Sequence, residues 1–85
     1  MSDRLGGATP TVLREGPYLF FYACYREEPP HVHVERDRQT AKIWLQPVQL
    51  ERSGGLSPPE IRRITRTVVD NETLFMEAWH ERFDT

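Results

Sequence analysis

The alternating segment His31–Glu35 constrains the fold more than any other part of this 85-residue chain. In an extended strand, successive side chains point to opposite faces of a sheet. His31, His33 and Glu35 therefore share one face, and the two valines between them take the other. Two prolines precede the segment and hold the chain extended up to His31, because proline fixes its own backbone and disfavours helix in the preceding residue. We expect a strand with an apolar core side and a polar side that carries two of the three histidines.

The residues that follow predict an antiparallel hairpin between strands 31–36 and 40–45. With Asp37 and Arg38 as a two-residue turn, the valines meet apolar partners and the polar residues meet each other. The expected pairs are Val34 with Ala41, Val32 with Ile43, His33 with Lys42, His31 with Trp44, and Glu35 with Thr40. A shift of one residue would move every apolar side chain to the polar face. The turn lacks the Asn-Gly or Asp-Gly of tight hairpins, so a longer loop is an alternative.

Three further strands are expected, at 11–14, 18–24 and 48–50. The strand at 18–24 is apolar or aromatic on both faces, which is typical of a central, covered strand. The aromatic residues expected in the core are Tyr18, Phe20, Tyr22 and Tyr25. Pro47 limits the last of the three to a short edge strand, because proline cannot donate to a sheet.

A well-marked helix start follows the glycine-containing loop Ser53–Gly55. Ser57 is placed to cap the helix, Pro58 suits its first turn and Glu60 completes a capping box. Apolar residues then recur at helical spacing, which favours one helix from about 58 to 82 over two short ones. Asp70–Glu72 is the weak point of this helix, with a kink or break there as the alternative. Glu72 falls inside the apolar stripe, where a buried carboxylate needs an arginine, a histidine or a partner chain.

These elements predict an α+β fold: an antiparallel sheet of four to five strands with one long C-terminal amphipathic helix on one face. We expect residues 1–8 to form a flexible N-terminal tail and residues 9–85 to form a single domain. Cys24 is the only cysteine, which excludes an internal disulfide and a multi-cysteine zinc site. No stretch approaches the ~18 apolar residues of a membrane span, so a cytoplasmic protein without a membrane role is expected. The net charge of −2 argues against bulk binding to nucleic acid.

The polar face of the hairpin admits three interpretations. His31 and His33 lie about 6.5–7 Å apart along the strand and could share a metal ion, but further zinc ligands are not apparent and Lys42 would repel a cation. No cofactor is therefore expected. An anion fits better: His31, His33 and Lys42 could act catalytically in phosphodiester cleavage of RNA, with Trp44 as a stacking surface. The third interpretation is a structural or partner-facing surface, to which Glu35 and Trp44 would contribute.

Arg62, Arg63 and Arg66 form a second candidate binding surface, on one side of the predicted helix. Cations near a helix N-terminus oppose its dipole, so local helix stability does not explain them. They suggest an acidic partner or a phosphate, with an ordinary solvated surface as the alternative. A homodimer is also possible, because so small a core gains from further apolar burial.

Several motifs together resemble a known family. They are TPTVLREG at 9–16, FFY at 20–22, PPHVHV at 29–34, AKIWLQPV at 41–48 and EAWHERF at 77–83. The chain is similar in these to the domain of unknown function 4160 family of small bacterial and archaeal proteins. Members are often encoded beside another small protein, in pairs that resemble toxin–antitoxin modules. The resemblance implies a small cognate protein as partner and assigns no catalytic residue. It departs at His80, where a polar residue such as asparagine is expected, so His80 is not a required ligand.

Overall fold

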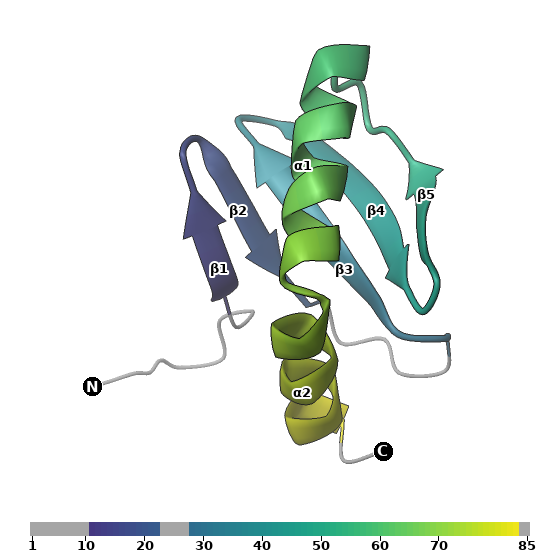
Figure 1. The fold of residues 1–85 in the computed structure, drawn as a ribbon. Coiled ribbons are helices and arrows are strands. Elements are labelled where there is room, and N and C mark those ends of the chain that lie inside the picture. The colour runs from purple at the N-terminus through teal and green to yellow at the C-terminus, as the bar shows by residue number, and fades with distance from the viewer. Residues whose placement is uncertain (1–10, 23–27, 84–85) are drawn as a thin grey trace, which may run out of the picture.

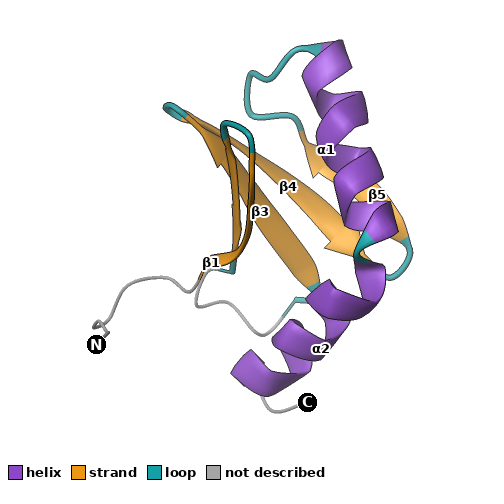
Figure 2. Ribbon diagram, turned by 60° about the vertical axis from the view of Figure 1, so that its left-hand side comes forward, coloured by secondary structure: helices purple, strands orange, loops and turns teal. Residues whose placement is uncertain are grey.

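Five strands form one antiparallel sheet in which each strand pairs with its neighbour in sequence. The computed structural model describes residues 11–22 and 28–83. Its elements are β1 (Thr11–Glu15), β2 (Tyr18–Phe21), β3 (His31–Arg36), β4 (Gln39–Leu45), β5 (Val48–Arg52), α1 (Pro58–Asp70) and α2 (Glu72–Phe83). α1 lies against one face of the sheet, and α2 runs past the ends of the strands (Figures 1 and 2). The α+β class and the five-stranded antiparallel sheet are confirmed.

The β3–β4 hairpin has the predicted register at all six pairs, from His31 opposite Trp44 to Arg36 opposite Gln39. Its two-residue turn contains Asp37 with φ of 56°, a left-handed conformation that aspartate tolerates better than most residues. The register is therefore set by the apolar pattern of the strands, even without a preferred turn sequence. β5 follows a cis Gln46–Pro47 peptide and forms an edge of the sheet, as predicted.

The core lies between the sheet and the helices. Side chains from β2, β3 and β4 face those of α1 and α2. The buried apolar residues are Tyr18, Phe20, Tyr22, Val32, Val34, Ala41, Ile43, Leu45, Leu56, Ile64, Val68, Phe75, Trp79 and Phe83. The predicted core positions of Tyr18, Phe20 and Tyr22 are thus confirmed, whereas Cys24 and Tyr25 lie outside the described residues. β2 ends at Phe21 in the structure, shorter than the predicted strand.

The predicted helix start is confirmed and carries an additional tie to the sheet. The Glu60 N–H donates to the Ser57 hydroxyl, and the Glu60 carboxylate accepts from the Ser57 N–H. The same carboxylate accepts from Arg36 of β3 and, at 3.0 Å, from the Tyr18 hydroxyl of β2. The Ser57 backbone, Arg36 and Tyr18 together hold the pKa of Glu60 at about 2. One carboxylate therefore joins the beginning of α1 to two strands.

Replacing Glu60 with glutamine should reduce the loss of the free energy of unfolding at acidic pH. A lowered carboxyl pKa contributes stability that is present above its ordinary value of 4.5 and is lost as the pH falls toward 2. We expect the free energy of unfolding of the wild type, from urea titrations at several pH values, to fall more steeply across this window than that of Glu60→Gln. Glu77→Gln, on an exposed part of α2, is the matched control. Equal slopes for wild type and Glu60→Gln would contradict the assignment.

The prediction of one continuous helix is wrong, because the helix breaks at Asn71. Asn71 has φ of −123° and ψ of 27°, and its side-chain amide donates to the Thr67 carbonyl at 2.8 Å. An asparagine side chain competes in this way with helical backbone bonding. Glu72 becomes the first residue of α2, where a carboxylate favours the positive end of the helix dipole. Its predicted place inside a continuous apolar stripe is therefore wrong as well. Neither α1 nor α2, the helices of the described residues, is long and apolar enough to cross a membrane.

Candidate functional site

The polar face of the β3–β4 hairpin is more buried than its sequence suggests. The register places His31, His33, Lys42 and Trp44 on one face, as predicted. His31 is fully buried and Lys42 is only 7% exposed, while His33 and Trp44 are half-buried. The structure therefore brings the predicted residues together but leaves His31 and Lys42 little access to solvent.

His31 occupies a compartment made largely of aromatic rings. Its ring centroid lies 5.2 Å from that of His33, 5.6 Å from that of Trp44 and 5.2 Å from that of Trp79 in α2. We call His31, His33, Trp44 and Trp79 the histidine box. His31 Nδ1 lies 2.9 Å from the Pro29 carbonyl and so carries the proton, because a carbonyl only accepts. Its Nε2 is buried with no hydrogen-bond partner in the part of the chain that the structure describes.

Lys42 lies beside the histidine box and interacts with Glu28 and Trp44. Its ammonium pairs with the Glu28 carboxylate and lies 4.7 Å from the centre of the Trp44 ring. The hydrogen bond from Lys42 lowers the pKa of Glu28. The Trp44 indole N–H donates to Glu51 of β5 at 2.9 Å. Sequence reasoning did not place Glu28 or Trp79 at this site. The acidic residues and prolines that precede β3 were a signal for Glu28. The expectation of one continuous helix obscured the position of Trp79.

The electrostatics of the two histidines favour neutral imidazoles. Burial, the neighbouring His31 and Lys42 lower the pKa of His33 to about 4. Burial is also the main cause that lowers the pKa of His31. A general acid near neutral pH needs a protonated group, so this arrangement does not favour paired acid and base catalysis. RNA cleavage by His31, His33 and Lys42 stays a prediction. Among the described residues, no three histidine, cysteine or acidic side chains are grouped as metal ligands.

The remaining predicted binding residues lie outside the histidine box. Glu35 is half-buried on β3, opposite Thr40 of β4 and Leu19 of β2. The three arginines of α1 are exposed, and Arg63 lies over the Tyr18 ring at 5.4 Å. Since α1 covers the other face of the sheet, these arginines and the histidines form separate surfaces.

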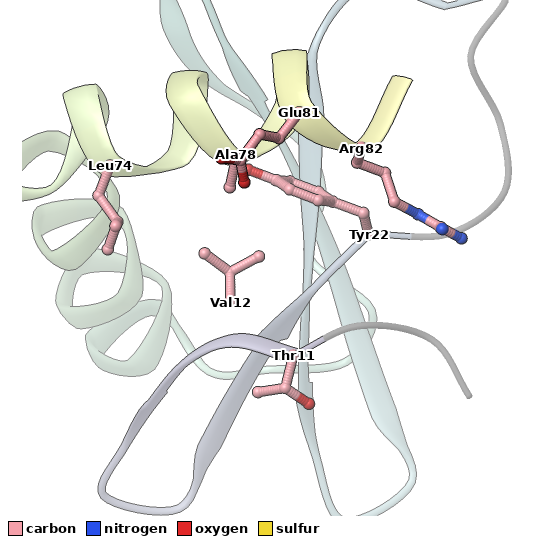
Figure 3. Close-up of a pocket in the computed structure, with 7 residues that line it drawn as sticks. All are labelled: Thr11, Val12, Tyr22, Leu74, Ala78, Glu81 and Arg82. Carbon is pink, nitrogen blue, oxygen red and sulfur yellow. The ribbon is translucent and has the colours of Figure 1, made fainter. Parts of the chain in front are cut away.

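A pocket of about 400 Å³ lies between β1 and α2 (Figure 3). Val12, Leu74 and Ala78 supply apolar side chains to its wall. The full lining is Thr11, Val12, Tyr22, Leu74, Ala78, Glu81 and Arg82. Val12 lies at an irregularity where Thr11 and Leu13 pair with the consecutive residues Phe21 and Phe20. Such a bulge redirects a side chain, and Figure 3 shows Val12 pointing toward α2. Sequence reasoning missed this pocket, because its walls meet only in the tertiary structure.

The family described as Domain of unknown function (DUF4160) matches residues 16–80, more than half of the chain. The chain belongs to this family. The DUF4160 segment contains the whole histidine box, whereas the pocket takes Thr11, Val12, Glu81 and Arg82 from outside it. No curated protein and no solved structure matches the chain.

Proposed function

We propose that this DUF4160 protein is a protein-binding module, one component of a toxin–antitoxin-like pair. Its pocket between β1 and α2 would receive an apolar side chain of a small cognate protein. The observation that carries the proposal is the pocket itself, which has an apolar wall and three polar residues, Thr11, Glu81 and Arg82. An apolar centre with a polar rim is the usual anatomy of a protein interface.

The exposure of Leu74 supports a macromolecular occupant. Leu74 is 42% exposed although it lines the pocket, so the pocket opens to solvent along an apolar wall. Val69, near the end of α1, is 51% exposed and adds apolar surface close to the helix break. A partner side chain anchored in the pocket would cover such surface, as anchor residues do at the centre of interfaces.

The charge distribution indicates which partner surface fits. Arg62, Arg63 and Arg66 are exposed on α1, the helix that leads into α2. Complementary charge speeds association and selects partners. We therefore infer a cognate protein that presents acidic side chains to α1 as well as an apolar anchor to the pocket.

A charge placed in the pocket should abolish this binding. Leu74→Glu would leave a carboxylate without a partner against the anchor, and loss of a central anchor weakens binding by about 100-fold or more. Leu50→Glu is the matched control, because Leu50 is 39% exposed but lies on β5 at the other edge of the sheet. Titration calorimetry with a small protein encoded beside the gene for this protein should show that Leu74→Glu loses affinity for it and that Leu50→Glu does not.

Other occupants of the pocket would give different results with the same variants. Equal affinity of wild type and Leu74→Glu would overturn the proposal, as would equal weakening by both variants. Light scattering of the protein alone identifies a second copy as the occupant if the wild type is a dimer that Leu74→Glu dissociates. Binding of RNA by the wild type that Leu74→Glu abolishes would assign the pocket to nucleic acid. Either of these last results would also overturn the proposal.

A further inference from the structure

The histidine box connects the sheet to α2 through a buried imidazole. Trp79 of α2 contacts the His31 ring on one side and, edge to face, the Tyr22 ring at 5.5 Å on another. Tyr22 in turn lines the pocket, and its hydroxyl donates to the Phe75 carbonyl of α2. The position of α2 at the end of the sheet thus depends on packing around His31.

We propose that proton uptake by His31 releases α2 from the end of the sheet, which makes the histidine box an acid-sensitive latch. Nδ1 already carries a proton that the Pro29 carbonyl accepts. A second proton must therefore go to Nε2, which is buried and has no described acceptor. The result is an unpaired donor and a positive charge inside a compartment of aromatic rings, and both are costly to bury.

The groups that face His31 oppose this charge more than they stabilise it. From β3 and β4 come His33 and the Lys42 ammonium, and α2 contributes the uncharged indole of Trp79. Arg52 of β5 adds a positive charge near His33. Among the residues that the structure describes, the acidic group facing His31 is Glu28, whose carboxylate lies 3.8 Å from His31 Nδ1 and is already paired with Lys42. Interaction of an imidazolium with the tryptophan rings would offset part of the cost.

The direction of the pH dependence follows from these contacts. Both histidines have pKa values lowered from the ordinary 6.5, that of His33 to about 4. The His31 imidazole takes up a proton more readily in the released state, so its contribution to the docking of α2 is complete above pH 6.5 and weakens as the pH falls below that value. Because α2 supplies Leu74, Ala78, Glu81 and Arg82 to the pocket, acid would also weaken partner binding; that consequence alone rests on the proposed function.

Amide hydrogen exchange of the full chain tests the latch without any partner. Protection of α2 amides, relative to α1 amides in the same sample, should fall roughly tenfold or more between pH 7 and pH 5 after correction for intrinsic exchange. His31→Phe keeps an aromatic ring but cannot take up a proton, so its ratio should not change with pH. His31→Met is a second neutral variant in case the phenylalanine is not accommodated.

Three results would overturn the latch. The first is a wild-type ratio of α2 to α1 protection that does not change with pH, and the second is a fall that persists in the folded His31 variants. A fall that only His33→Gln abolishes would assign the proton to His33 instead of His31. Failure of partner binding in the calorimetry above would leave the exchange result unaffected, so the two proposals fail separately.

Discussion

Gly54→Ala is expected to destabilise the protein by about 2–5 kcal/mol. Gly54 has φ of 65°, a left-handed conformation that costs a residue with a Cβ about 1–2 kcal/mol. An added Cβ would also lie 1.9 Å from the Thr40 carbonyl oxygen and 2.4 Å from its carbon. These are backbone atoms of a residue that is paired with Glu35 in the β3–β4 ladder, so they cannot move aside, and overpacking adds roughly 1–3 kcal/mol. The check is the free energy of unfolding from urea denaturation.

Gly16→Ala separates the two contributions to this loss. Gly16 has φ of 56°, close to that of Gly54, but its added Cβ would meet the flexible end of the Arg63 side chain at 3.0 Å. It should therefore show only the conformational cost, about 1–2 kcal/mol. Equal losses in both variants would show that the loop backbone at Gly54 moves away from Thr40.

Phe75→Ala is the second large effect, with an expected loss of about 3–5 kcal/mol. The Phe75 ring is fully buried and its centroid lies 5.6 Å from that of Phe20 in β2. The chain is near the small end of independently stable domains, where total stability is about 5–15 kcal/mol and often less. Thermal unfolding should therefore shift down by roughly 12 °C or more.

Leu74→Ala is the matched control in the adjacent position. Leu74 belongs to the same helix but is 42% exposed, so truncation leaves little cavity and should cost about 1 kcal/mol or less. A loss for Leu74→Ala as large as that for Phe75→Ala would mean that the pocket wall is part of the core. That result would argue against an open binding pocket.

The sequence determined the hairpin and the start of the helix. The alternation of valine with polar residues in β3, matched by Ala41 and Ile43 in β4, leaves one register in which the apolar side chains share a face. The capping box depends on Ser57 and Glu60, three positions apart, so it is also a local property. Such features are predictable because the groups that make them are near neighbours or strictly periodic.

The sequence was less informative where distant elements compete with local preference. Helical spacing continues from Ile64 to Trp79, so periodicity alone did not show the break at Asn71. The break depends on the Asn71 amide and on packing of α2 past the ends of the strands. Pattern also placed His31 on a polar face, whereas the structure buries it completely, in contact with Trp79 among others.

The chain by itself thus determined an antiparallel sheet, its central register and the residues that share a sheet face with His31. The tertiary structure alone decided that Trp79 contacts His31, that Glu28 pairs with Lys42, and that a pocket lies between β1 and α2. The physical reason is the range of the interactions. Strand alternation and helix capping act over a few residues, whereas burial and a pocket wall depend on where α2 comes to lie after the break at Asn71.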